Sequence, residues 1–255
     1  MTCEDAAVSA WNQRDETALA LLPGALVEPS PDLLARLGRS RRVVPLAYPD
    51  ATRMTDLTDA LAARLAGAGV KHADVLGSSY GGWVAQCLAQ RHPALVRDLV
   101  LVHTFALRAA DARRFRIGLK LWKFMPRASF GLLGAARVKR LLRPLRAASP
   151  AEHERVEAQL VAAIRSPATI DALFRQNLCM LESCTAFAEG LPKGRRVLIV
   201  ESDDDPAVGA DDRARLRARF PGATVRTFHG TGHITALVAP EAYAEAVNAF
   251  LDSPA

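Results

Sequence analysis

A glycine-flanked serine between an apolar run and an amphipathic pattern limits most strongly how this chain can fold. Gly77-Ser78-Ser79-Tyr80-Gly81 directly follows the apolar run Ala73–Leu76 and opens a helical pattern that extends to His92. A serine at the tip of a sharp strand-to-helix turn has a strained backbone, and small residues two positions away on each side let neighbouring segments approach. The pattern therefore predicts such a turn with Ser79, rather than Ser78, as an exposed nucleophile. The alternative is a glycine-rich turn in which a serine only caps the helix.

Short apolar runs alternate with longer helical patterns on both sides of this turn. Nearly continuous apolar runs are typical of parallel strands that are covered on both faces. The expected strands are Leu19–Leu22, Val43–Ala47, Ala73–Leu76, Leu99–His103, Val197–Glu201 and Thr224–Phe228. The expected helices between and after them are Pro31–Leu37, Thr55–Gly67, Tyr80–His92, Asp211–Phe220 and Pro240–Leu251. The sequence thus predicts an α/β fold, with a mostly parallel six-stranded sheet and helices on both faces.

The alternation stops between Thr104 and Leu191, where four helical patterns follow one another without a strand pattern. Ser149-Pro150 and Ser166-Pro167 are typical helix starts, because a serine can cap the helix and proline fits its first turn. We therefore predict a core formed by residues 1–103 and 192–255, with a helical cap over residues 104–191 inserted after the fourth strand.

The candidate nucleophile needs a base, because a serine hydroxyl alone is a poor nucleophile. His233, within Gly230-Thr231-Gly232-His233-Ile234, follows the last expected strand and precedes the final helix. We predict that it is the base; a loop histidine without a catalytic role is the alternative. His103 ends the fourth expected strand and could line the pocket at the hinge of the cap, whereas His229 is expected to be structural.

An acid should orient that base from the loop after the strand at Val197–Glu201, where three consecutive aspartates begin at Asp203. A buried carboxylate bonded to an imidazole fixes its tautomer and stabilises the imidazolium. We predict Asp205, which directly precedes Pro206, with Asp204 as the second candidate. The other aspartates would be solvated turn residues.

An oxyanion hole requires two backbone N–H groups. One is expected from Tyr80, directly after the nucleophile, and the other from the loop after the first strand. In that loop Ala25 is the expected donor, because Gly24 lets the backbone turn toward the site and Pro23 has no N–H. An ordinary Pro-Gly turn is the alternative.

The glycine-flanked Ser79, the aspartate cluster and the His233 loop, in this chain order, resemble the α/β-hydrolase superfamily over nearly the whole chain. Three segments are similar to maspardin and its relatives: Val43–Pro49, Leu76–Gln86 and Leu119–Pro126. That group is thought to include adaptor-like members that keep a nucleophile-like serine but lack a complete triad. The Gly-x-Gly-His loop and the Asp-Pro pair of this chain depart from that pattern and favour an active enzyme. Pro23 stands where many hydrolases have a histidine before glycine.

The charge of the chain is concentrated in one segment. Residues 108–146 contain twelve basic residues and one acid, a charge of +11, so the remainder carries −5 of the net +6. Basic amphipathic helices can lie on anionic membrane surfaces or attract acidic ligands. The alternative is a cap whose charges are simply in water, and binding of nucleic acid is not expected because no recognition motif accompanies the charge.

Four cysteines without metal-ligand spacing, and a first segment without an apolar signal-peptide core, favour a cytoplasmic protein with reduced thiols, no metal and no cofactor. Our first hypothesis is a carboxylesterase-like or thioesterase-like serine hydrolase that cleaves a small, mainly apolar acyl ester or thioester through an acyl-enzyme on Ser79. A non-catalytic adaptor or binding protein on the same fold is the alternative. A third reading is a biosynthetic enzyme that uses the cavity for lyase or cyclisation chemistry.

Overall fold

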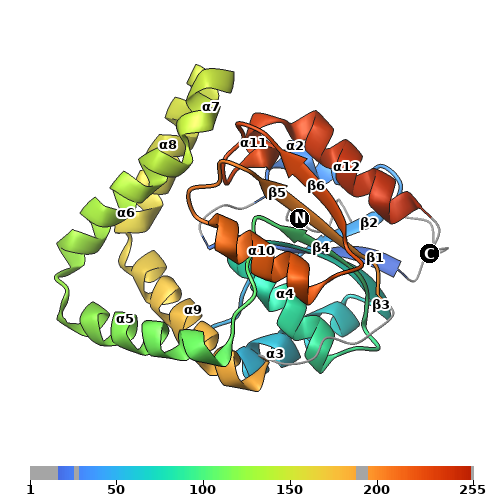
Figure 1. Cartoon of the computed structure of the whole chain (residues 1–255), viewed down its shortest axis with the longest axis horizontal. Helices are drawn as coiled ribbons and strands as arrows, with labels where there is room; N and C mark the ends of the chain where they lie inside the picture. Colours follow the sequence, from blue (N-terminus) through green and yellow to red (C-terminus); the bar gives the residue numbers. More distant parts are fainter. Residues whose placement is uncertain (1–16, 26–28, 188–194, 254–255) are drawn as a thin grey trace.

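The computed structural model describes residues 17–25, 29–187 and 195–253 and contains one six-stranded parallel sheet (Figure 1). The strands are β1 (Thr17–Leu22), β2 (Arg42–Pro45), β3 (His72–Ser78), β4 (Val96–Val102), β5 (Val197–Ser202) and β6 (Thr224–Phe228). They pair in the order β2-β1-β3-β4-β5-β6, and every pair is parallel. The predicted α/β fold with six strands is confirmed.

Helices cover both faces of the sheet because successive strand side chains point to opposite faces. On β1, Leu19 and Leu21 pack with α2 (Pro31–Leu37) and α12 (Pro240–Asp252). Ala18, Ala20 and Leu22 pack in the other layer, with α3 (Met54–Gly67), α4 (Tyr80–Arg91) and α10 (Ala210–Arg219). These five helices begin and end within one residue of the predicted bounds.

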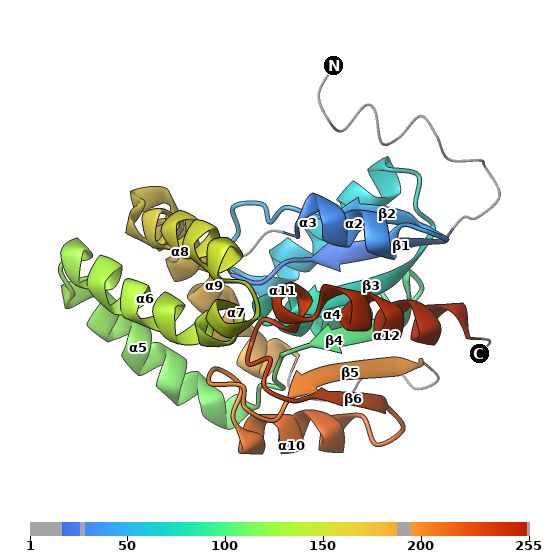
Figure 2. The ribbon, with the colours of Figure 1, turned by 90° about the horizontal axis from the view of Figure 1, so that it is seen from above.

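All described elements between β4 and β5 are helical, and they lie beside the sheet rather than on its faces (Figure 2). They are the short 3₁₀ helix η1 (Ala109–Asp111) and the α-helices α5 (Ala112–Phe124), α6 (Arg127–Leu141), α7 (Arg143–Ala148), α8 (Pro150–Arg165) and α9 (Pro167–Ala186), here called the cap. The predicted boundary at 191–192 lies outside the described residues, so the division into core and cap stays a prediction.

The cap contains one α-helix more than the four predicted helical patterns. The basic pattern after Pro126 forms two helices, α6 and α7, which meet at Leu142. Pro144 occupies the first turn of α7 and has no N–H to donate to the preceding helical turn, so the helix breaks there. No helix in the described ranges has the length and apolarity that a membrane span requires.

Helix α9 joins the cap to the core through buried polar contacts. The indole Nε1 of Trp83 on α4 donates to the Ser183 hydroxyl at 2.7 Å, and both side chains are fully buried. Glu182 accepts from the backbone N–H of Met54 at 2.8 Å. The carboxylate therefore caps α3, whose preceding residue makes no side-chain cap of its own.

We predict that Ser183→Ala destabilises the protein by about 1–3 kcal/mol, because it leaves the buried Trp83 N–H without an acceptor. Urea unfolding of both proteins measures this difference. The matched control is Thr185→Ala on the same helix, since that side chain is exposed and its hydroxyl bonds only within the helix. The control should change stability by less than about 0.5 kcal/mol, and equal effects of the two substitutions would contradict the prediction.

Candidate functional site

The turn between β3 and α4 holds Ser79 in a strained backbone conformation. Its φ is 53° and its ψ is −116°, a region that a non-glycine residue seldom adopts. A Cβ added to Gly77 would overlap the carbonyl group of Gly81, and one added to Gly81 would overlap the carbonyl oxygens of Leu22 and Pro23. Both positions therefore require glycine, because the neighbouring backbone segments lie too close for a side chain, as the spacing of the motif predicts.

Thr104 fixes the same turn from the end of β4. Its hydroxyl donates to the carbonyl oxygen of Ser79 at 2.7 Å, and the Ser79 N–H donates to the Val102 carbonyl at 2.8 Å. A Cβ on Gly82 would overlap the Thr104 side chain, so these two residues fit one another closely. This contact could not be predicted from the sequence, because the sheet alone brings the two residues together.

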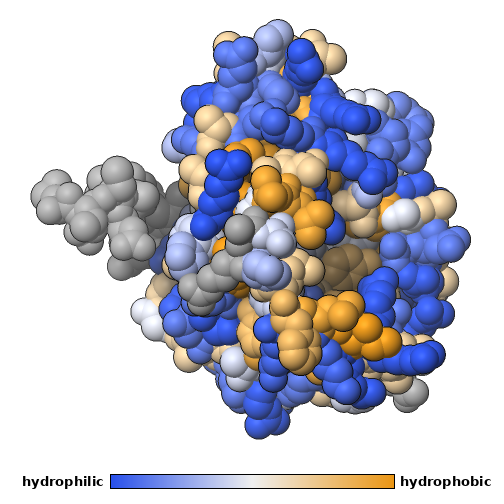
Figure 3. Space-filling model, turned by 90° about the vertical axis from the view of Figure 1, so that its left-hand side faces the viewer, coloured by the Kyte–Doolittle hydropathy of each residue, from blue (hydrophilic) through white to orange (hydrophobic). Residues whose placement is uncertain are grey.

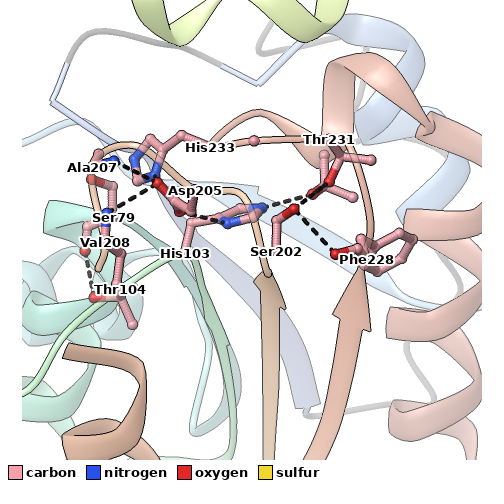
Figure 4. Close-up of polar contacts among 12 residues, drawn as sticks. Ser79, His103, Thr104, Ser202, Asp205, Ala207, Val208, Phe228, Thr231 and His233 are labelled. Carbon is pink, nitrogen blue, oxygen red and sulfur yellow. Dashed lines mark hydrogen bonds and ion pairs between the residues drawn. The ribbon is translucent and has the colours of Figure 1, made fainter. Parts of the chain in front are cut away.

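The structure brings Asp205 and His233 into direct contact (Figure 4). His233 Nδ1 lies 2.8 Å from Asp205 Oδ2 and 3.0 Å from Oδ1. Oδ1 also accepts from the backbone N–H groups of Ala207 and Val208 at 2.8 and 3.0 Å. The carboxylate is thereby fixed at the end of β5, and it faces the imidazole.

The two neighbouring aspartates have other partners. Asp204 accepts from the N–H of Gly232 at 3.0 Å and from the Ser202 hydroxyl, so it holds the loop that carries His233. Asp203 pairs with His229 at 2.6 Å on the surface, where both side chains are at least half exposed. Among the three aspartates, only Asp205 contacts His233.

A second histidine binds the same carboxylate. His103 Nδ1 lies 3.0 Å from Asp205 Oδ2, and His103 Nε2 lies 2.8 Å from the Thr235 hydroxyl. The side chain is 2% exposed, and its φ of 45° is left-handed. The sequence placed His103 at the cavity but gave no reason to expect its bond to Asp205.

The electrostatics of this cluster favour an ionised Asp205 carboxylate beside a neutral His103 imidazole. Burial alone would raise the pKa of Asp205, but the hydrogen bonds from both histidines and from the Ala207 N–H outweigh burial and hold that pKa well below its usual range. Burial lowers the pKa of His103, and the adjacent His233 contributes in the same direction against the opposing effect of Asp205. Asp205 is therefore ionised and His103 neutral near pH 7.

Ser79 and His233 line one cavity of about 210 Å³ together with His103, Gly24 and Ala25. Much of the remaining wall is apolar and comes from both core and cap, including Leu22, Val102, Val138, Leu142, Leu160 and Ile234. A concave apolar site with a few convergent polar groups is typical of a small-molecule site.

The candidate oxyanion donors lie beside the nucleophile. A Cβ on Gly24 would be 3.6 Å from the Ser79 Cβ, so the loop after β1 lies against the serine. The Tyr48 hydroxyl donates to the Pro23 carbonyl at 2.7 Å and holds this loop. Tyr80 begins α4, so its N–H has no acceptor within the helix and is available to a ligand. The roles of Tyr80 and Ala25 stay predictions.

One cluster in the described residues has the composition of a metal site. His103, Asp205 and His233 each offer a ligand atom, and these atoms lie within 4.8 Å of one another. A metal ligand must present a lone pair, whereas the Nδ1 atoms of both histidines face Asp205 at donor distances. The arrangement fits a hydrogen-bonded acid–base network better than a metal centre.

Comparison with known families accords with this geometry. The model of the alpha/beta hydrolase family matches residues 8–246. The chain belongs to the alpha/beta hydrolase family. No curated protein sequence matches it.

Solved structures of low sequence identity share the fold of this alpha/beta hydrolase. MGS-M2, an alpha/beta hydrolase enzyme from a Medee basin deep-sea metagenome library, is 15% identical with a TM-score of 0.77, covering 97% of this chain and 93% of that one. The enol-lactonase from Burkholderia xenovorans LB400 is 16% identical with a TM-score of 0.71, covering 95% and 94%. A thermophilic esterase from Thermogutta terrifontis is 18% identical with a TM-score of 0.70, covering 92% and 89%.

We predict that Gly81→Ala destabilises this alpha/beta hydrolase by about 2 kcal/mol or more, because the new methyl group would overlap backbone carbonyls that cannot rotate away. Denaturant unfolding measures the effect. Gly118→Ala is the control, since a Cβ there meets nothing within 4 Å on the exposed side of α5. That control should be neutral or stabilising by up to about 1 kcal/mol; a Gly81 variant as stable as the control would show that the turn is not tightly packed.

Proposed function

We propose that this chain is a serine hydrolase that cleaves an ester or thioester with a mainly apolar acyl group. The observation that carries the proposal is the meeting of three features at one cavity: a strained serine, a histidine bonded to a buried aspartate, and an apolar wall. A non-catalytic role for the same fold would not require the aspartate and the histidine to be aligned in this way.

Each residue of the proposed triad has one task. The Ser79 hydroxyl oxygen attacks the substrate carbonyl, and His233 takes its proton on Nε2, because Nδ1 is already bonded to Asp205. Asp205 keeps that tautomer and stabilises the imidazolium that forms. His233 then gives the proton to the alcohol or thiol leaving group as its bond to the acyl carbon breaks. The acyl group remains bound to Ser79.

Release of the acyl group reverses these roles. A water molecule gives its proton to His233 and attacks the acyl carbonyl, and the acid leaves as Ser79 regains the proton. In both steps the N–H groups of Tyr80 and Ala25 would hold the oxyanion, and the positive end of α4 behind Ser79 favours the same negative charge.

The cavity wall and the structural neighbours support the proposed substrate class. Apolar side chains of core and cap would bind an acyl chain by removing its surface from water. The names of two neighbours, an enol-lactonase and an esterase, support ester or lactone hydrolysis for a site of this shape.

The closer similarity to maspardin stays a prediction and would favour an adaptor-like role. In that group a nucleophile-like serine occurs without a complete triad, whereas here Asp205 and His233 are in contact. Lyase or cyclisation chemistry in the same cavity would need the same base without an acyl-enzyme. We therefore place hydrolysis first. Labelling of Ser79 distinguishes it from the adaptor-like role, and analysis of the products distinguishes it from lyase or cyclisation chemistry.

We predict that the protein hydrolyses p-nitrophenyl esters and that Ser79→Ala and His233→Ala each lower kcat/KM by about 10³-fold or more, since nucleophile and base act as one unit. Hydrolysis rates of esters with acyl chains from acetyl to dodecanoyl measure these kcat/KM values. The preferred chain length also indicates the length of the acyl pocket. Ser78→Ala is the matched control, because Ser78 lines the same cavity without standing at the strained position.

A fluorophosphonate probe gives the independent readout, since it labels only an activated serine. Labelling should be present in the parent protein and in Ser78→Ala, and absent in Ser79→Ala. If the parent protein hydrolyses none of the esters and is not labelled, the hydrolase proposal is wrong and the binding-protein alternative remains.

A further inference from the structure

The outer side of the cap exposes large apolar side chains. Of the six that are exposed in the described part of the chain, five lie on α5 and α6. They are Ile117, Leu121, Phe124, Leu132 and Leu133. Phe124 is 86% exposed, so no described part of the chain packs over it. Figure 3 views this side and shows hydrophobic areas bordered by hydrophilic ones.

Helix α5 has two separate apolar faces. Its inner face carries the buried Ala112 and Leu119, which account for its packing on the rest of the protein. On the outer face Ile117, Leu121 and Phe124 follow the spacing i, i+4 and i+7, so they form one continuous stripe. A stripe opposite the packed face is not needed for folding, and its exposure costs solubility.

Basic side chains border this stripe. Helix α5 alone carries five cations and no acid, and α6 and α7 also contain no acid. By helical spacing, Arg113 and Lys120 lie on one side of the stripe and Arg114 on the other. The same surface therefore combines an apolar centre with a strongly positive border.

We propose that the outer face of α5 and α6 docks on the surface of an anionic lipid bilayer. The apolar stripe would enter the boundary between headgroups and acyl chains, while the cations meet lipid phosphates and carboxylates. A second copy of the chain fits this face poorly, because a two-fold contact would set the same cations against one another. A soluble acidic ligand or a nucleic acid would leave the apolar stripe in water.

Flotation of the full chain with phosphatidylcholine vesicles, with and without phosphatidylserine, tests the proposal. We expect binding only when phosphatidylserine is present, and weaker binding at high salt. The double variant L121S/F124S should weaken binding by about tenfold or more, since it removes the inserted side chains. The variant R113Q/K120Q should weaken it by about fivefold per charge.

Two control variants carry the same kinds of change elsewhere. Val225→Ser removes the exposed apolar side chain of β6, and Arg39→Gln removes a cation before β2; neither should change binding. Far-UV circular dichroism verifies that all variants are folded. Equal binding to both vesicle types, or unchanged binding of L121S/F124S, would overturn the proposal. A protein that is dimeric by light scattering and becomes monomeric in L121S/F124S would overturn it as well, in favour of a second copy.

A different observation, the bond between His103 and Asp205, carries a second inference, which rests on the proposed function. We infer that His103 is a positioning residue that holds the Asp205 carboxylate in place for His233. Asp205 Oδ2 accepts from both imidazoles, at 3.0 Å from His103 and 2.8 Å from His233, and the two rings are 5.4 Å apart. The N–H that His103 donates fixes the rotation of the Asp205 carboxylate. It also takes up part of the negative charge that would otherwise interact with His233.

The hydroxyl groups behind His103 fit a neutral ring. With Nδ1–H donating to Asp205, Nε2 must accept, and the Thr235 hydroxyl at 2.8 Å can donate to it. Thr235 then accepts from Thr231 at 2.7 Å, the shorter of the two contacts of that hydroxyl, the other being 3.2 Å to Ser202. Each hydroxyl or ring proton in this series of hydrogen bonds, from Thr231 to Asp205, then has one acceptor.

Titration of His233 separates this role from a purely structural one. The charged groups near the two rings are Asp205, which bonds to both, and Glu201 on β5, which acts electrostatically on His103; Arg137 lines the same cavity. Replacing His103 with Phe keeps a ring but removes the donor, so Asp205 would interact more strongly with the imidazolium of His233. We expect the pKa of His233 to rise by about half a unit to one unit. The acid limb of kcat/KM should move to higher pH by the same amount, because the base must be neutral to act.

Proton NMR titration of the imidazoles, with the His233 signal assigned from a His233→Gln variant, measures this pKa without turnover. It thus tests the inference even if the hydrolase proposal fails. His103→Asn should restore much of the parent value, because asparagine tolerates positive φ and can donate an N–H. An unchanged His233 pKa in His103→Phe, with activity lowered equally at every pH, would reduce His103 to a structural residue.

Discussion

The Asp205 carboxylate connects three loops at the carboxyl edge of the sheet, and the geometry of the candidate site depends on it. It follows β5, while its two imidazole partners, His103 and His233, follow β4 and β6. A buried carboxylate is tolerated only when its charge is fully hydrogen-bonded, and here two ring N–H groups and two backbone N–H groups supply the bonds. The same contacts that offset burial also fix the direction of the base, so stability and alignment have one cause.

The candidate nucleophile, Ser79, depends on a different constraint, which is steric. Ser79 keeps a positive φ in a turn where the backbone at Gly77 lies too close to Gly81, and that at Gly81 too close to the end of β1, for a side chain at either glycine. Thr104 and the sheet bond to Val102 then hold the turn from β4. Strain at the serine persists because the surrounding backbone leaves no alternative, as is usual where a fold presents a reactive group.

The sequence was most informative where local physics decides the structure. Apolar runs and helical periodicity predicted the strands and the five core helices, and the glycine spacing predicted the turn at Ser79. Pro144 could have predicted the break between α6 and α7. The bond from Thr104 to Ser79, the cap that Glu182 places on α3 and the second histidine on Asp205 could not be predicted, because each joins residues that meet only after the sheet and cap have formed.

Helix α6 shows why the cap cannot be understood from the core alone. One side of the helix contributes Val138 and Leu141 to the cavity, while Leu132 and Leu133 near its middle are exposed on the outer surface. An amphipathic helix of a globular protein normally has one apolar face, which packs inward. A helix with apolar groups on two sides has two environments to satisfy, and the cavity accounts for one of them. Helix α6 carries basic residues and no acid, so an anionic surface with an apolar interior, as proposed above, would satisfy the second environment in a way that water cannot.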